Sequence, residues 1–383
     1  MTIFQRELSA AAAILIAVAT WVAPAGAVRA ESTKDVARIV AAGGQFTCAQ
    51  VTSGVLRCWG YNGDRELADG NTRNTRQPVT VEGVTHVATT TTGWNSSCEV
   101  STAGTVNCWG GDTYGQLGNA QIEPSAGPSK VKGLTQAIRV SVGGYSACAV
   151  LTSKKVACWG RGDLGELGNG STKTSDKAVD VGGMASIVQV SVGFAHVCAL
   201  RSDGAVFCWG DGLFGDLGIG SSFEASRPEQ VAISHVDQIA AGGTHTCALV
   251  AGGLVKCWGA NAYGQLGVGT THSEDTPTTV HRLSGVIAIA TGENHTCALL
   301  KDHFVVCWGS NEFGQLGTGN ERNSLVPAPV KRLEGVISIT TGGSHTCALL
   351  ADRTVECWGY NFFGQLGDGS VRDSTLPVPV KGF

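Results

Sequence analysis

The sequence predicts an all-β fold, a seven-bladed β-propeller in which each blade is a four-stranded antiparallel sheet. A unit of about 50 residues occurs seven times between about residues 36 and 383, and each unit contains short segments in which apolar residues alternate. Glycine accounts for 54 of the 383 residues, which suits tight turns between short strands. Self-similarity at a period of this length is typical of stacked supersecondary units.

Two cysteines define the register of each unit. The second cysteine precedes Trp-Gly, the first lies ten residues earlier, and successive first cysteines are 50 residues apart except for one interval of 49. Each unit also has a glycine five residues before its first cysteine, from Gly43 to Gly342, and a leucine nineteen residues after it, from Leu67 to Leu366. Because the units leave no room for another domain, we expect residues 31–383 to form a single domain.

The strands can be read in order from the sixth unit. Segments 295–300 and 305–308 alternate with apolar residues on both faces, which indicates strands buried on both sides. The three residues 301–303 that follow the first segment suit a hairpin loop whose last residue is left-handed; other units have Gly54 or Gly204 at this last position. We expect a third strand at 286–290 and a fourth at 327–330, where proline suits a sheet edge.

A sheet that is apolar on both faces must stack against neighbours. Stacking seven four-stranded sheets around an axis closes a ring. An open solenoid would need polar caps, but the first and last units resemble the middle ones. No helical period is found after the leader segment, and the propeller is therefore preferred.

The cysteine pairs predict one disulfide per blade. In a hairpin with an odd loop, residues i and i+10 lie opposite each other at a distance near that of a disulfide. Each bond contributes about 2–3 kcal/mol by loop entropy. Free thiols and metal ligands are the alternatives, but the spacing lacks the two-residue separation usual for zinc. The predicted pairs are Cys48–Cys58, Cys98–Cys108, Cys148–Cys158, Cys198–Cys208, Cys247–Cys257, Cys297–Cys307 and Cys347–Cys357.

The first 30 residues are typical of a secretory signal peptide. Arg6 precedes an apolar stretch at 8–22, Pro24 interrupts it, and small residues follow, with cleavage expected after Ala27 or Ala30. The stretch is about 15 residues long, whereas a membrane-spanning helix needs about 20, so we prefer a cleaved signal to an anchor and expect no stable membrane insertion. The sequence thus predicts a secreted or periplasmic protein, in an environment that favours disulfides.

Composition and motifs argue against several functions. The formal net charge is −4 and there is no long basic run, so we expect no nucleic-acid partner. Phosphate-binding loops, H-E-x-x-H and recognisable Ser/His/Asp contexts are not found in the sequence. We therefore expect no catalytic residues, no metal and no cofactor.

Three recurring sets of residues are interpreted as structural. Histidines two residues before the first cysteine could form a metal ring, but we favour histidines at a strand entry bonded to the backbone. Aromatic residues before the Gly-Gln-Leu-Gly segment, and the tryptophans after cysteine, are expected to pack between blades. Carboxylates in place of that glutamine are expected to be solvated. These sets are His196, His245, His295 and His345; Tyr114, Phe214, Tyr263, Phe313 and Phe363; and Glu66, Glu166 and Asp216.

The loop between the recurring glycine and the first cysteine varies from unit to unit. It carries Trp94, Tyr145 and Phe194 in units two to four, and Phe46 lies slightly later in unit one, whereas units five to seven have no aromatic residue there. Aromatic side chains at loop tips are typical binding hot spots. We hypothesise that these four residues bind a partner from half of one rim; the alternative is that they fill the axial channel.

The segment from Gly343 to Gly369, with its G-x-x-H-T-x-A-L and W-G-x-N-x-x-G-Q-L-G strings, resembles the regulator of chromosome condensation repeat family. The resemblance recurs seven times and implies a seven-bladed propeller. The name-giving member is a nuclear exchange factor for a small GTPase and docks on nucleosomes, using a β-wedge inserted in one blade and a basic tail. These repeats show no insertion, residues 31–35 are not basic, and an exported protein does not meet a nuclear partner.

The resemblance is closer in function to secreted bacterial members, such as one class of β-lactamase inhibitory protein, which grip another protein with one propeller face. We therefore expect a monomeric, non-enzymatic scaffold that binds an unidentified protein. A carbohydrate-binding, lectin-like propeller and a hydrolase or lyase on a propeller scaffold are the alternatives. A lectin would be retained on a glycan array, and an enzyme would have carboxylates or histidines converging in the channel.

Overall fold

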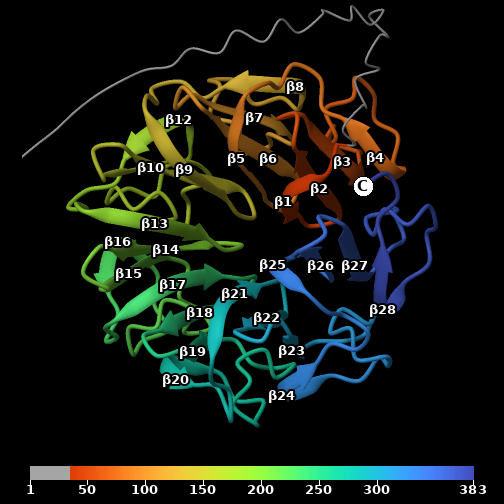
Figure 1. The fold of residues 1–383 in the computed structure, drawn as a ribbon. Helices are drawn as coiled ribbons and strands as arrows, with labels where there is room; N and C mark the ends of the chain where they lie inside the picture. Colours follow the sequence, from red (N-terminus) through yellow and green to blue (C-terminus); the bar gives the residue numbers. More distant parts are fainter. Residues whose placement is uncertain (1–34) are drawn as a thin grey trace, which may run out of the picture. The chain divides into compact units, whose positions relative to one another are not determined.

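Seven four-stranded antiparallel sheets surround a common axis in the computed structural model, which describes residues 35–383 (Figure 1). This confirms the seven-bladed propeller. The proposed signal peptide, 1–30, and its boundary lie outside the described residues. No helix of sufficient length and apolarity to traverse a bilayer occurs among residues 35–383.

Each blade consists of four strands that are consecutive in the chain, and no strand is shared between blades. The strands are, in blade 1, β1 (Ala37–Ala42), β2 (Phe46–Val51), β3 (Leu56–Gly60) and β4 (Thr75–Thr80); in blade 2, β5 (Val87–Thr92), β6 (Ser96–Ser101), β7 (Val106–Gly110) and β8 (Ser125–Lys130); in blade 3, β9 (Ala137–Val142), β10 (Ser146–Leu151), β11 (Val156–Gly160) and β12 (Ser175–Asp180); in blade 4, β13 (Ile187–Val192), β14 (His196–Arg201), β15 (Val206–Gly210) and β16 (Ala225–Gln230); in blade 5, β17 (Val236–Ala241), β18 (His245–Val250), β19 (Leu254–Gly259) and β20 (Glu274–Thr279); in blade 6, β21 (Val286–Thr291), β22 (His295–Leu300), β23 (Val305–Gly309) and β24 (Ser324–Pro329); and in blade 7, β25 (Val336–Thr341), β26 (His345–Leu350), β27 (Val355–Gly359) and β28 (Ser374–Pro379).

The first strand of each blade lies nearest the axis. The strands β1, β5, β9, β13, β17, β21 and β25 contact one another around the centre of the ring, and the fourth strands lie at the outside (Figure 1). The expected strand at 286–290 is therefore the innermost strand, β21. The expected edge strand at 327–330 is β24, which starts earlier, at Ser324, and ends at Pro329. Two extra residues in β24 between its pairs with Cys307 and Gly309 shift the register, so that Gly309 opposes Ser324.

The hairpin between the second and third strands has the predicted geometry. In blade 6 the N–H of Leu300 donates to the carbonyl of Phe304 at 2.9 Å across a three-residue loop. The last loop residue is His303, with φ of 67°, and Gly54 and Gly204 occupy the same place with φ of 83°. The left-handed position thus explains why most units use glycine there.

The seven predicted disulfides are present, and every cysteine of the described chain takes part in one. Each joins directly opposite residues of β2 and β3 or their equivalents, with Cα–Cα distances of 4.0–4.1 Å. The pairs are those expected from the spacing: Cys48–Cys58, Cys98–Cys108, Cys148–Cys158, Cys198–Cys208, Cys247–Cys257, Cys297–Cys307 and Cys347–Cys357.

The hydrophobic core lies between blades. The tryptophan of one blade packs on the disulfide and the leucines of the preceding blade, as Trp109 does against Cys48 and Cys58. Its indole N–H crosses the interface to a backbone carbonyl at 2.8–3.0 Å, so a large apolar ring is buried with its one donor satisfied. The donor–acceptor pairs are Trp59–Gln365, Trp109–Glu66, Trp159–Gln116, Trp209–Glu166, Trp258–Asp216, Trp308–Gln265 and Trp358–Gln315.

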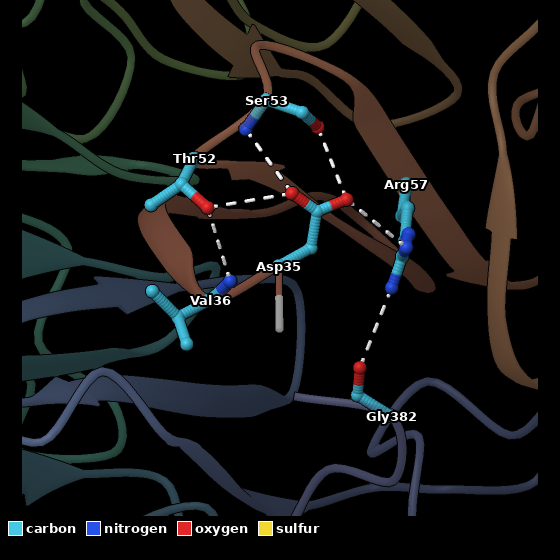
Figure 2. Close-up of polar contacts among 6 residues, drawn as sticks. All are labelled: Asp35, Val36, Thr52, Ser53, Arg57 and Gly382. Atoms are coloured by element: carbon cyan, nitrogen blue, oxygen red, sulfur yellow. Dashed lines mark hydrogen bonds and ion pairs between the residues drawn. The ribbon is translucent and has the colours of Figure 1, made fainter. Parts of the chain in front are cut away.

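The ring closes by packing blade 7 against blade 1. The Trp59 ring of blade 1 contacts the Phe383 ring in a tilted arrangement, with ring centroids 5.7 Å apart. Figure 2 shows polar contacts at the same place. The carboxylate of Asp35 accepts hydrogen bonds from the N–H (3.1 Å) and the hydroxyl (3.0 Å) of Ser53, and it lies 3.5 Å from the guanidinium of Arg57. Arg57 in turn donates to the carbonyl of Gly382 at 3.3 Å. The Arg57–Gly382 hydrogen bond therefore joins the two blades, and Asp35, at the start of the described chain, contacts the same arginine.

Candidate protein-binding face

One face of the propeller carries two sets of loops. The start of β2 and the end of β3 lie side by side, because Phe46 pairs with Gly60. The loops joining first to second strands and those joining third to fourth strands therefore emerge on the same side in every blade. We call this side the glycine-loop face, and the opposite side, which carries the β2–β3 hairpins and their equivalents, the hairpin face.

A ring of backbone hydrogen bonds surrounds the axis on the glycine-loop face. The second residue of each loop donates its N–H to a glycine carbonyl of the next blade. A Cβ added to the first loop residue would collide with the neighbouring backbone, for instance at 2.8 Å from the Gly93 oxygen if placed on Gly43. The bonds are Gly44–Gly93 (2.9 Å), Trp94–Gly143 (3.0 Å), Gly144–Gly193 (3.0 Å), Phe194–Gly242 (3.2 Å), Gly243–Gly292 (3.1 Å), Glu293–Gly343 (3.3 Å) and Gly343–Gly43 (3.1 Å).

Only three of the seven second positions bear a side chain: Trp94, Phe194 and Glu293. All three line a cavity of about 120 Å³ at the mouth of the central channel. The rings of Trp94 and Phe194 meet edge to face at 5.7 Å although they belong to blades 2 and 4. A Cβ on Gly343 of blade 7 would lie 3.4 Å from the Trp94 ring, so Trp94 reaches across the mouth.

Three of the four hypothesised binding residues come together. Tyr145 lies 5.5 Å from Phe194, and its ring is 5.0 Å from that of Tyr114, over which Arg161 is placed at 5.6 Å. Trp94, Phe194, Tyr145 and Tyr114 thus form a continuous aromatic cluster over blades 2 to 4, which we call the first aromatic cluster. It runs outward from the channel mouth, whereas the sequence hypothesis placed these residues on a rim or inside the channel.

Phe46 does not belong to this surface, and its assignment to the binding site is wrong. Its side chain is fully buried in the core between blades 1 and 2. Phe46 is the first residue of β2, the register position that His196 occupies in β14, and side chains there point into the blade interface instead of outward from the loop. A shift of one residue along the strand entry separates an exposed loop residue from a buried one.

A second aromatic cluster, missed by the sequence analysis, covers blades 6, 7 and 1. Phe313 contacts Tyr360 at 4.7 Å, and Phe363 contacts Phe362 at 5.0 Å and Tyr61 at 4.9 Å. Phe362 is 63 % exposed. The available signal was variation after the Cys-Trp-Gly string, where Tyr61 and Tyr360 stand in place of small or charged residues.

The aromatic residues before the Gly-Gln-Leu-Gly segment are less buried than expected. They were expected to pack between blades, and Tyr114 contacts Tyr145 of the next blade, but Tyr114, Phe214 and Tyr263 are also 36 %, 44 % and 44 % exposed. Some of them still touch the next blade, but they do so at the surface of the glycine-loop face. These rings extend the exposed aromatic area beyond the two clusters.

A pocket of about 190 Å³ lies between the two clusters. Trp94 forms one wall and Phe313 and Tyr360 the other. The polar groups are the Glu293 carboxylate, the Gln45 amide and the Ser344 hydroxyl, together with two loop glycines, Gly44 and Gly343. Glu293 is half-buried, and this burial raises the pKa of its carboxyl group.

Comparison with known proteins identifies the family. The model of the RCC1-like domain matches residues 175–383, and that of the regulator of chromosome condensation (RCC1) repeat matches residues 103–150. The chain belongs to the RCC1-like domain family. Among curated proteins, no relative matches it.

Solved structures of other proteins share the fold of this RCC1-like protein. Yeast RCC1 (Prp20), solved with Kap60 bound, is 20 % identical with a TM-score of 0.78, covering 90 % of this chain and 85 % of that one. Human WBSCR16 is 23 % identical with a TM-score of 0.73, covering 80 % and 84 %. The ectodomain of the Physcomitrella patens receptor kinase CR4 is 19 % identical with a TM-score of 0.56, covering 85 % and 74 %.

Charge differs between the two faces of the RCC1-like propeller. With four buried carboxyl groups of raised pKa left out (Glu66, Asp112, Glu166 and Asp216), the loops of the glycine-loop face contain eleven Asp or Glu against six Lys or Arg, whereas the loops joining strands on the hairpin face contain five against eight. The complete chain is nearly balanced, with 31 acidic and 27 basic residues. The aromatic face is therefore also the acidic face, which favours an electropositive partner surface.

The four recurring histidines are structural, but their partners differ from the expectation of backbone bonds. Each is fully buried, and its Nε2 lies 2.8–3.0 Å from a threonine hydroxyl of the next blade. Each hydroxyl donates its own hydrogen to a backbone carbonyl, so Nε2–H must donate to the threonine. Burial lowers the histidine pKa to about 4 at His196 and about 3 at the others: His245, His295 and His345.

The carboxylates in place of the recurring glutamine are buried, so the expectation of solvated side chains is wrong. Glu66, Glu166 and Asp216 are at most 2 % exposed. The side chain folds back under the loop, as in Glu66, whose Oε2 accepts the N–H of Asp64 at 3.0 Å. Burial raises the pKa of Glu66 and of Asp216 to about 8. The Asp216 carboxyl lies 3.3 Å from Nδ1 of His196.

Proposed function

We propose that this RCC1-like protein is an extracytoplasmic scaffold that binds another protein through its glycine-loop face. The observation that carries the proposal is the partly exposed aromatic surface made by the two clusters, which extends over blades 6, 7 and 1 and over blades 2 to 4. Tyrosine and tryptophan dominate binding hot spots because they bury a large area at low entropic cost.

Rigidity of the face supports the proposal. The seven backbone bonds around the channel mouth and the disulfide behind each loop hold the aromatic residues in place before a partner arrives. Preorganisation of this kind reduces the entropy lost on binding. The solved complex of yeast RCC1 (Prp20) with Kap60 is an example of a structurally similar propeller that binds a protein.

The extracytoplasmic location is supported by two features. Seven disulfides are present, and such bonds persist in oxidising compartments. The sequence before residue 31 also has the pattern of a secretory signal peptide.

The test uses paired variants in an affinity capture from the extracytoplasmic fraction of the source cells. Trp94→Ala with Phe362→Ala alters the glycine-loop face, and Leu254→Ala with Phe304→Ala alters two exposed apolar residues on the hairpin face. We expect the first pair of substitutions to weaken the affinity for a captured protein at least tenfold, a loss of about 1.4 kcal/mol or more in binding free energy. The second pair should leave the capture unchanged. Equal capture by both pairs, or retention on a glycan array in place of protein capture, would contradict the proposal.

A further inference from the structure

The pocket between the two aromatic clusters combines aromatic residues with a carboxylate. Its residues come from the four consecutive blades 6, 7, 1 and 2, and Trp94 is the contribution of blade 2. Three aromatic rings and one carboxylate face a common space of about 190 Å³. By liquid volume this holds about six water molecules, which is enough for one long side chain and too little for a strand or helix.

Glu293 is the unusual member of this set. At its loop position the other blades have glycine or an aromatic residue, so no repeat constraint requires a carboxylate there. Among residues 35–383, no Lys, Arg or His forms an ion pair with it. A carboxylate that is partly removed from water and lacks a counter-charge carries a desolvation cost that an incoming cation would offset.

The aromatic rings of the pocket also favour a cationic ligand. A cation beside the face of Trp or Tyr is attracted by the ring quadrupole, and the effect is stronger when the site is desolvated. The apolar stem of a lysine or arginine side chain packs on such rings while its charged head reaches the carboxylate. The acidic loops around the pocket attract cations and repel anions.

We propose that this pocket is a socket for one cationic side chain, lysine or arginine, on the surface of the protein partner. The charged head faces Glu293, and its stem lies between Trp94 on one side and Phe313 and Tyr360 on the other. The proposal rests on the proposed function for the kind of partner, and adds which chemical group that partner must present.

Trp94 provides a specific reporter for the test. In the described chain, the other seven tryptophans are fully buried and each donates its indole N–H to a carbonyl. The indole resonance of Trp94 is therefore distinguishable in an NMR titration of the 31–383 chain. The probes are the blocked tripeptides Gly-Lys-Gly and Gly-Arg-Gly, with Gly-norleucine-Gly as the uncharged control.

We expect the lysine and arginine peptides to shift the Trp94 indole signal saturably, with Kd in the millimolar range, about −4 kcal/mol. The norleucine peptide should give no saturable shift. Glu293→Gln should weaken binding of the cationic peptides at least fivefold, and Glu312→Gln, at an exposed carboxylate in the same blade, should leave it unchanged. Raising the salt concentration should weaken the cationic peptides only.

Equal binding of the norleucine peptide, no saturable shift with either cationic peptide, or an unchanged affinity in Glu293→Gln would overturn the socket. Those results leave the paired-variant capture experiment intact, since a partner could still bind the aromatic face through other groups. Conversely, peptide binding that depends on Glu293, combined with capture that is indifferent to Trp94→Ala and Phe362→Ala, would retain the socket and reject the protein-binding face.

Discussion

The interfaces between blades and the loops of the glycine-loop face differ in how strictly they repeat. The indole-to-carbonyl bond occurs in all seven interfaces with distances of 2.8–3.0 Å. The second loop position, about the same axis, holds Trp94, Phe194, Glu293 and four glycines. Closing a symmetric ring imposes the same packing on every blade, whereas the loop tips are free to differ, so the departures from symmetry indicate where a partner binds.

The strongest test of this contrast replaces tryptophan in each region. Trp209→Ala removes a fully buried ring that packs on the disulfide of blade 3, and should lower the free energy of unfolding by about 3–5 kcal/mol. Trp94→Ala should lower it by less than about 1 kcal/mol, because the ring lies at the channel mouth and no blade interface depends on it. Urea denaturation of both variants measures the difference, and similar losses would remove the distinction between the regions.

Removal of a disulfide should have the next largest effect. Replacing both Cys297 and Cys307 by alanine removes the disulfide of one hairpin and should lower the free energy of unfolding by about 2–3 kcal/mol. The loss should appear in the melting temperature under oxidising conditions and be smaller when wild type and variant are compared after reduction. A double variant as stable as the oxidised wild type would show that the disulfides do not stabilise the ring.

Glu66 tests whether a residue that differs from the repeat pattern and is buried in a blade interface lowers the stability of the fold. Its carboxyl has a pKa of about 8 in the folded protein against 4.5 for the free group, so folding binds a proton and stability falls as pH rises from about 4.5 to 8. Glu66→Gln, which introduces the glutamine found at this position in four other blades, should stabilise by about 1–3 kcal/mol at pH 8 and by little at pH 4. Thermal melts of both proteins between pH 4 and pH 8 measure this difference. A gain in stability that does not depend on pH would contradict the raised pKa of Glu66.

The smallest expected effects are those of surface changes on the stability of the ring. Glu293→Gln and Phe362→Ala should each alter the free energy of unfolding by within about 0.5 kcal/mol, since both side chains lie outside the blade interfaces. Their effects should instead appear in binding experiments. A large loss of stability in either variant would show that the face contributes to closure of the ring. The binding data would then be taken from the other of the two variants.

The local sequence pattern was sufficient to predict the strands, the hairpin turn and the cysteine pairs, because these features depend on residues close in sequence. It was insufficient where a neighbouring blade decides the environment. Phe46 looked like a loop residue, but blade 2 covers it. Glu66 looked solvated because glutamine and glutamate are polar, yet the loop and the Trp109 of the next blade enclose it. The cluster around Tyr360 and Phe363 was missed because its members come from separate repeats.

The sequence alone determined the number of blades, the four strands in each and the partner of every cysteine in the described chain, since a fifty-residue period and a ten-residue spacing encode them locally. Only the tertiary structure decided which aromatic residues are exposed and that Trp94, Glu293 and Tyr360 share one pocket. These three residues are separated by whole blades in the chain, and the curvature of the closed ring brings them to the same axis.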